Sequence, residues 1–191
     1  MKQLLRVILI VVLFGCGAAG NEIKKVRIYL TDVKVKYLDK ESPRLKSKVV
    51  ENICWNYRGA LIKTLQKENK QASVEFVAYL MDRSATTAYT GKAEAFVLPL
   101  IIVKDSKYYA YARVSSTKGS YSRELQPVAF EKAGEAENKI KTAVLGAFSV
   151  FKDGLGEEQK ALCFEDGAAE LREFKLDEVA VNVIRESGLG K

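Results

Sequence analysis

The side chains that could carry out a reaction are carboxylates, lysines and cysteines, because the 191-residue sequence contains no histidine. Histidine is the commonest general base near neutral pH, the usual partner of a serine or cysteine nucleophile, and a frequent metal ligand. The carboxylate pairs Glu157-Glu158 and Glu165-Asp166 fall in predicted helices or turns beside basic residues, which is typical of a solvated surface. The sequence therefore predicts a protein that is not an enzyme and that holds no metal or cofactor.

Two of the three cysteines, Cys54 and Cys163, could form a disulfide with each other in an oxidising compartment. Such a bond would close a long loop and tie a predicted helix to the C-terminal region. The alternative is a pair of buried thiols that act as small hydrophobic side chains, since Cys54 falls on the apolar side of its predicted helix. Both interpretations stay open on the sequence.

A group of tyrosine and arginine side chains forms the candidate partner-binding face. Tyr109, Tyr111 and Arg113 share one face of a predicted strand because side chains alternate with a period of two. Tyrosine and arginine are enriched at binding hot spots, so this face could receive a protein partner or a glycan. The alternative is ordinary cross-strand aromatic pairing within a sheet.

Residues 23–38 are predicted to form a strand whose apolar positions change phase once. Apolar side chains occupy alternate positions before residue 31 and the opposite alternate positions after residue 32. One buried face requires all of them on the same side, so we expect a bulge or a tight turn at Thr31-Asp32. The side chains of this expected face are Val26, Ile28, Leu30, Val33, Val35 and Tyr37.

Two long amphipathic helices are predicted, one on each side of a β-rich region. The first begins at Ser42-Pro43, where serine can cap a helix and proline fits its first turn, and it ends near residue 69. Trp55 lies beside the apolar stripe of this helix and is expected to pack against the sheet or its edge. The second helix covers residues 131–151 and should end at Gly154. Predicted strands cover residues 73–82, 93–103, 108–115, 120–129 and 176–185.

This order of elements predicts an α+β fold: an antiparallel sheet with two long amphipathic helices packed on one face, as a two-layer sandwich. The content of 48% hydrophobic and 29% charged residues is typical of a globular protein. We expect one domain over residues 23–186 and a flexible tail over residues 187–191. The formal net charge of +7 is spread along the chain, which predicts solvated faces and no nucleic-acid partner.

The hairpin predicted at residues 93–115 has a long apolar first arm that allows two interpretations. It could insert into a membrane as part of an oligomeric barrel, because spanning strands need about nine to eleven residues. The arm is apolar on both faces, however, which favours a buried central strand. Pro99 indicates that this strand lies at an edge of the sheet or at a bulge.

The amino terminus has the layout of an export signal. Lys2 and Arg6 make its first residues positive, and an uninterrupted apolar run follows over residues 7–14. That run is too short to span roughly 30 Å of hydrocarbon at about 1.5 Å per residue. It has the length and flanking residues of the apolar region of a signal peptide.

The segment Leu13-Phe14-Gly15-Cys16 resembles the lipobox of bacterial lipoproteins, with leucine three positions before the cysteine and a small residue directly before it. The resemblance implies cleavage between Gly15 and Cys16 and a lipid on Cys16 that anchors the protein in a membrane. Residues 1–15 would be the signal peptide, and residues 16–22 the lipidated cysteine with a short tether. Phe14 departs from the pattern, which usually has a smaller residue there. The alternative is a plain secretory signal cleaved after Gly20.

These features predict a non-enzymatic, membrane-anchored lipoprotein that binds or scaffolds another protein of the cell envelope. Gly17, in place of aspartate after the cysteine, resembles an outer-membrane address, so we expect an outer-membrane lipoprotein that faces the periplasm. Homo-oligomerisation stays open. The alternative function is a periplasmic lipoprotein that binds a small ligand or a lipid in a hydrophobic cleft between sheet and helices.

Overall fold

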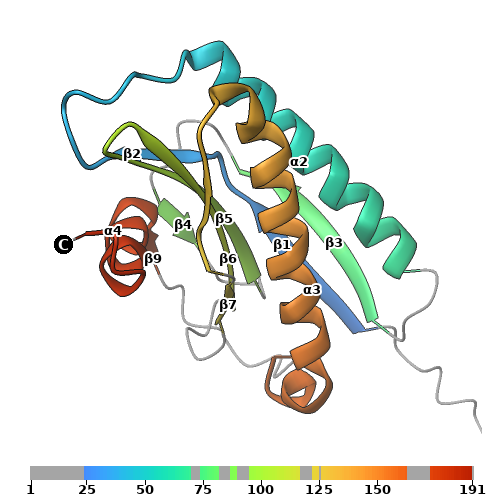
Figure 1. Ribbon diagram of the computed structural model, residues 1–191. Coiled ribbons are helices and arrows are strands. Elements are labelled where there is room, and N and C mark those ends of the chain that lie inside the picture. Colours follow the sequence, from blue (N-terminus) through green and yellow to red (C-terminus); the bar gives the residue numbers. More distant parts are fainter. Residues whose placement is uncertain are drawn as a thin grey trace, which may run out of the picture.

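The computed structural model describes residues 24–69, 74–81, 87–89, 95–116, 122–124, 126–162 and 173–190. Helices and strands are both present, and the protein has an α+β fold, as the sequence predicts (Figure 1). In chain order the elements are β1 (Lys24–Leu30), β2 (Lys34–Tyr37), α2 (Ser47–Glu68), β3 (Val74–Leu80), β4 (Thr87–Tyr89), β5 (Ala95–Lys104), β6 (Lys107–Ser116), β7 (Ser122–Glu124), β8 (Val128–Phe130), the 3-10 helix η1 (Ala133–Glu135), α3 (Ala136–Leu162), β9 (Glu173–Lys175) and α4 (Leu176–Glu186).

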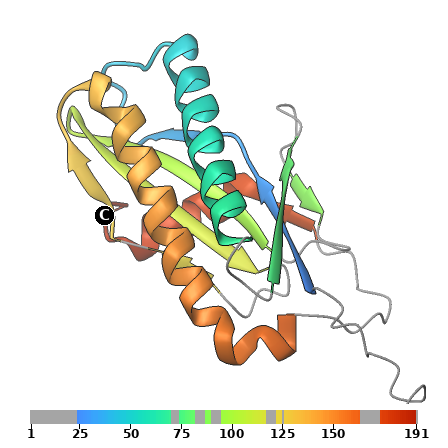
Figure 2. The ribbon, with the colours of Figure 1, turned by 90° about the vertical axis from the view of Figure 1, so that its right-hand side faces the viewer.

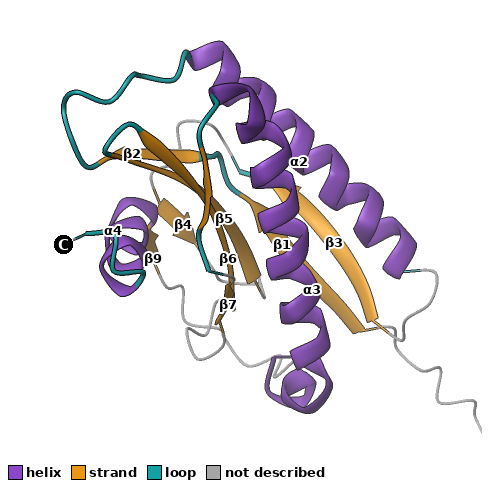
Figure 3. Ribbon diagram, viewed as in Figure 1, coloured by secondary structure: helices purple, strands orange, loops and turns teal. Residues whose placement is uncertain are grey.

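The main sheet is mixed, so the expectation of an antiparallel sheet is wrong. Strand β1 runs parallel to both β3 and β5, and β2 runs parallel to β5. The remaining pairs, β5 with β6 and β6 with β7 and β8, are antiparallel. The parallel pairing arises because α2 carries the chain back along the sheet between β2 and β3, which is how parallel neighbours are connected (Figure 3).

The expected bulge lies between β1 and β2, which together form one interrupted strand beside β5. Leu30 pairs with Val97, whereas Lys34 pairs with Leu100, so four steps on one strand face three on the other. Because of the extra residue, the odd-numbered side chains after the bulge lie on the same face of the sheet as the even-numbered side chains before it. Val26, Ile28, Leu30 and Val33 are all buried in the same core cluster as a result.

Pro99 lies in the middle of the central strand β5, opposite this bulge. The carbonyls of Val97 and Val103 accept hydrogen bonds from Thr31 N–H and Leu38 N–H, so the odd-numbered backbone groups of β5 face β1 and β2. The nitrogen of Pro99 therefore points at the gap between the two ladders, where no backbone donor is needed. Proline is tolerated in this central strand because its neighbour is bulged.

The helices lie on both faces of the sheet, so the fold is not the expected two-layer sandwich. Helices α2 and α3 cover one face, over a core built from β1, β3, β5, β6 and both helices. Residues 176–185, predicted as a strand, belong to α4, which packs on the opposite face against Leu100, Ile102 and Tyr111 (Figure 2). The buried side chains of α4 follow helical spacing: Leu176, Ala180, Val183 and Ile184.

The ends of the long helices differ from the predicted ones. Helix α2 begins at Ser47 because Ser42 is used elsewhere: its N–H and hydroxyl both donate to the Asp39 carboxylate, at 2.6 and 2.9 Å. Helix α3 extends past Gly154 to Leu162. After α4, Leu189 packs against the α4 face of the sheet, and its carbonyl accepts a hydrogen bond from Lys104 Nζ at 3.0 Å. That part of the predicted tail therefore contacts the domain.

The hairpin between β5 and β6 turns at Asp105-Ser106, between the strands predicted at residues 93–103 and 108–115. Both residues have a positive φ, 52° and 61°, as in the two-residue turn that fits the twist of a hairpin. The N–H groups of Asp105 and Ser106 donate to Asp39 Oδ2 and Ser42 Oγ, at 2.9 and 3.0 Å. The loop that leads to α2 therefore holds this turn in its left-handed conformation.

Ser106→Gly is expected to raise the free energy of unfolding by about 0.5 to 1 kcal/mol, because glycine adopts a positive φ without the steric cost of a Cβ atom. The backbone N–H that donates to Ser42 is retained. Urea denaturation of both proteins measures the change, and an unchanged or lower stability would contradict the left-handed turn.

The outer edge of β3 is partly covered by one side chain. Asn69, which follows α2, donates from its Nδ2 to the Phe76 carbonyl at 2.9 Å and accepts from the Phe76 N–H at 2.7 Å. A single amide side chain thus occupies the backbone groups through which another strand would pair at this position.

Candidate functional site

The candidate binding face predicted from Tyr109, Tyr111 and Arg113 is covered by α4 rather than open. Tyr111 is only 3% exposed and packs against α4, and Tyr109 packs against the same cluster. The guanidinium of Arg113 lies 3.7 Å from the carboxylate of Glu186, the last residue of α4. The interpretation as a partner-binding face is corrected for this reason: the sequence placed a strand where a covering helix lies.

Several predicted site residues lie outside the described ranges: Gly15, Cys16, Cys163, Glu165 and Asp166. The lipidation site and the Cys54–Cys163 disulfide stay predictions. Cys54 itself is buried in α2, and its Sγ accepts a hydrogen bond from the N–H of Val33 at 3.3 Å.

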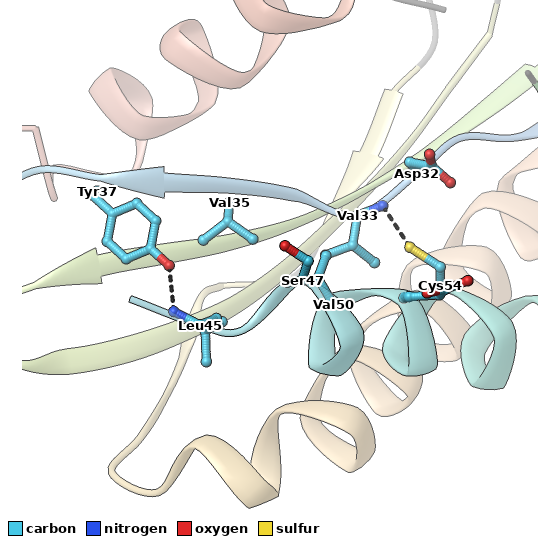
Figure 4. Close-up of a pocket in the computed structure, with 9 residues that line it drawn as sticks. Asp32, Val33, Val35, Tyr37, Leu45, Ser47, Val50 and Cys54 are labelled. Atoms are coloured by element: carbon cyan, nitrogen blue, oxygen red, sulfur yellow. Dashed lines mark hydrogen bonds between the residues drawn. The ribbon is translucent and has the colours of Figure 1, made fainter. Parts of the chain in front are cut away.

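The structure instead contains a groove between β2 and the first half of α2, which we call the β2–α2 groove (Figure 4). Its volume is about 410 Å³, and it is open to solvent. One wall is formed by side chains of β2 and of the two residues before it, and the other by α2 together with Leu45, two residues before its start. The lining residues are Asp32, Val33, Val35, Tyr37, Leu45, Ser47, Val50, Glu51 and Cys54.

The groove is apolar along its floor and acidic at one end. Val33, Val35 and Val50 line the middle, where Figure 4 shows the β2 side chains directed toward α2. Asp32 and Glu51 are the charged lining residues, and the lining includes no lysine or arginine. The lining is therefore acidic in a chain with a net charge of +7, and Arg58, which is not a lining residue, pairs with Asp32 at 2.7 Å.

The far end of the groove is closed by Tyr37. Its hydroxyl accepts a hydrogen bond from the N–H of Leu45 at 2.7 Å, and the guanidinium carbon of Arg44 lies 3.9 Å from the centre of its ring. Such a cation–π contact holds the ring in place. The loop before α2 is therefore fixed against the end of β2.

Behind the acidic end, three α2 side chains at positions i, i+3 and i+4 hold the bulge. Cys54 accepts from Val33 N–H, the hydroxyl of Tyr57 donates to the carbonyl of Thr31, and Arg58 donates to the carbonyl of Leu30 at 3.2 Å. Arg58 also pairs with Asp32 at 2.7 Å. This spacing places all three on one side of the helix, so α2 satisfies the Val33 N–H and the Thr31 carbonyl at the bulge. The Leu30 carbonyl also accepts a backbone hydrogen bond from the N–H of Met81 at 3.2 Å. Burial raises the pKa of the Tyr57 hydroxyl, which therefore stays a neutral donor.

An exposed tryptophan lies on the same helix, one turn beyond Glu51. Trp55 is 56% exposed, so the expectation that it packs against the sheet is wrong. Residues four apart on a helix are neighbours on its surface, which places Trp55 beside the acidic end of the groove. Tryptophan is among the residue types most enriched at binding hot spots.

The described residues include no helix with the length and apolar character to cross a membrane, and no group of three or more acidic or cysteine side chains placed to hold a metal ion. Comparison of the chain with models of protein families and with curated proteins found no match. The groove must therefore be interpreted from its own geometry.

One feature of this site has a signal in the sequence, and the other has none. The face formed by Val33, Val35 and Tyr37 was predicted from their alternation, together with the bulge that positions it. That these residues border a groove depends on which side of β2 has a neighbouring strand, and no local pattern contains that information.

Proposed function

We propose that the protein is a lipid-anchored, non-enzymatic accessory of a cell-envelope assembly, and that it binds another envelope protein through the β2–α2 groove. The observation that supports binding is the open apolar groove itself, with an exposed tryptophan beside its acidic end. The resemblance of residues 13–16 to a lipobox supports the anchor. The same resemblance, with Gly17 after the cysteine, supports an outer-membrane location facing the periplasm.

The anchor is tested by intact mass spectrometry of protein extracted from its native membrane, beside a Cys16→Ala variant. We expect a mature chain that begins at Cys16 and carries acyl chains, and an unlipidated chain in the variant. An unlipidated mature chain that begins at Asn21 in the wild-type protein would contradict the anchor and support plain secretion.

The groove is tested by site-specific photo-crosslinking in native membranes. A crosslinkable amino acid at Ser47, an exposed lining residue, should capture a protein partner, whereas the same amino acid at Val181, exposed on α4, should not. Introducing Val50→Glu should abolish the Ser47 crosslink, because it places a charge on the apolar floor. Equal crosslinking from Ser47 and Val181, or a Ser47 crosslink insensitive to Val50→Glu, would contradict binding through the groove.

A second candidate function is binding of a small apolar ligand or a lipid in the same groove. Its volume of about 410 Å³ favours this candidate, because ligand pockets commonly measure roughly 300 to 1,000 Å³. Native mass spectrometry distinguishes the two: a co-purifying small molecule that is lost in the Val50→Glu variant would favour the ligand, and a bare protein mass would favour the partner.

A further inference from the structure

We infer that the partner binds as an added β-strand along the outer edge of β2, as an extended segment with apolar side chains at alternate positions and a basic side chain near Asp32 and Glu51. This inference rests on the proposed function and specifies the chemistry of its partner.

Strand β2 uses only one of its two edges among the described residues. Its inner edge pairs with β5 over Lys34–Tyr37. Strand β3 pairs with β1 as far as Leu30↔Leu80, and no described strand continues beside β2. Among the described residues the sheet thus has a step at the bulge, with no strand paired to the outer edge of β2.

The backbone groups at that outer edge belong to the odd-numbered residues of β2. The N–H of Leu38 donates to the carbonyl of Val103 on β5, so the even-numbered backbone groups of β2 face inward. Backbone groups alternate between the two edges of a strand, so the N–H and C=O groups of Val35 and Tyr37 face outward. The N–H of Val33 also faces outward, and there it donates to Cys54 on α2. Val35 and Tyr37 therefore offer donors and acceptors for strand addition.

The groove lies beneath this edge. A strand added to β2 would run about 4.8 Å from it, with alternate side chains directed to the α2 face. That face presents Val50 and Ser47 from α2, so apolar side chains of moderate size fit there. On the opposite face Lys34 and Lys36 are held by Asp177 of α4, at 3.9 and 3.0 Å.

The charge of the groove lining also favours a particular segment. The lining contains two carboxylates, Asp32 and Glu51, and no basic side chain. Arg58 already pairs with Asp32 at 2.7 Å, so Asp32, Glu51 and Arg58 together carry one net negative charge. A lysine or arginine of the added segment at the bulge end of β2 would be attracted by that charge, whereas an acidic residue there would be repelled. Charge therefore sets the register of the segment along β2.

The test uses the purified full-length protein in detergent micelles and a labelled hexapeptide in which valine alternates with threonine and one end carries an additional lysine. Fluorescence anisotropy measures its Kd, and amide hydrogen exchange by NMR measures protection of β2. We expect the Val35 and Tyr37 amides to become protected at least tenfold on binding. The Lys34 and Lys36 amides, which face β5, should be protected with and without the peptide.

Two isomeric peptides supply the decisive control. One is N-methylated at its valines and the other at its threonines, so each removes the donors on one edge of the peptide strand. Strand addition uses one edge, so we expect one isomer to lose at least tenfold in affinity and the other to bind as the unmodified peptide does. The isomer that loses affinity also reports the direction of the added strand. In an antiparallel pair, the peptide residues whose side chains face the groove donate their N–H groups to β2. In a parallel pair, the residues next to them donate instead.

Two protein variants locate the site. Ser47→Trp fills the groove from an exposed position and should weaken the peptide at least tenfold, whereas Lys48→Trp, on the adjacent residue outside the lining, should not. Replacing the lysine of the peptide by glutamate should weaken binding at least fivefold, and less in a Glu51→Gln variant.

Equal affinity of both N-methylated isomers, or amides of Val35 and Tyr37 that are already protected in the free protein, would overturn strand addition. The proposed function would survive that result if the groove-dependent crosslink at Ser47 were still obtained. Loss of that crosslink would contradict the proposed function whatever the peptide does.

Discussion

Val183→Asp is expected to lower the free energy of unfolding by about 3 to 5 kcal/mol, because it places an unpaired charge between α4 and the sheet. Val183 is 1% exposed and belongs to the cluster formed by Leu100, Ile102, Tyr111 and the buried side of α4. Chemical denaturation followed by tyrosine and tryptophan fluorescence measures the change.

Val181→Asp is the matched control, since it makes the same substitution two residues earlier on the same helix. Val181 is 57% exposed, so its replacement should change the stability by no more than about 0.5 kcal/mol. In a strand, residues 181 and 183 would share one face and respond alike. Equal effects of the two substitutions would therefore contradict the helix and its place on the sheet.

Asp32→Ala is expected to cost about 3 kcal/mol, because it leaves the guanidinium of Arg58 buried without its carboxylate. Arg58 is 4% exposed, and its Nε has no hydrogen-bond partner among the described residues of the intact protein. The remaining bond of Arg58 to the Leu30 carbonyl does not neutralise its charge.

A double-mutant cycle separates this charge effect from a general loss of packing. Arg58→Leu in the Asp32→Ala background removes the buried charge, so we expect the double variant to be more stable than Asp32→Ala alone. Glu51→Ala, at an exposed carboxylate of the same groove, should cost less than about 1 kcal/mol. A double variant less stable than the single one would show that Arg58 acts chiefly through packing and its bond to Leu30.

The elements that the sequence predicted well are those with a strong local pattern. The apolar stripe of α2, the hairpin around Asp105-Ser106 and the bulge after Leu30 all follow from the spacing of neighbouring residues. The α+β class follows from the order of these elements.

The incorrect predictions concern segments whose local pattern fits both a helix and a strand, and features that depend on pairing between strands far apart in the sequence. Val179, Val181 and Val183 alternate as in a strand, but Leu176, Ala180, Val183 and Ile184 also have helical spacing, and the helix is the outcome. Asp177 and Glu178 in the first turn and Arg185 in the last are helix signals. The prediction of a strand at residues 176–185 also explains why Tyr111 was expected on an open face, because α4 covers it.

The groove could not be predicted because it depends on which strands are neighbours. A sequence of strands separated by short turns suggests antiparallel pairing, and nothing in residues 24–37 indicates that the interrupted strand lies parallel to β5. Among the described residues, β3 ends beside Leu30 and no strand pairs with the outer edge of β2, which is a property of the whole sheet.

Because of Asn69, the outer edges of β3 and β2 differ in how readily they can pair with a strand of another molecule. A strand edge that is free to pair is a common starting point for aggregation, and native proteins protect such edges with local devices. The amide of Asn69 occupies both backbone groups of Phe76, in a strand of otherwise high β-propensity. It therefore blocks the pairing of another strand with β3 at Phe76, and leaves the proposed strand addition to the shorter edge of β2.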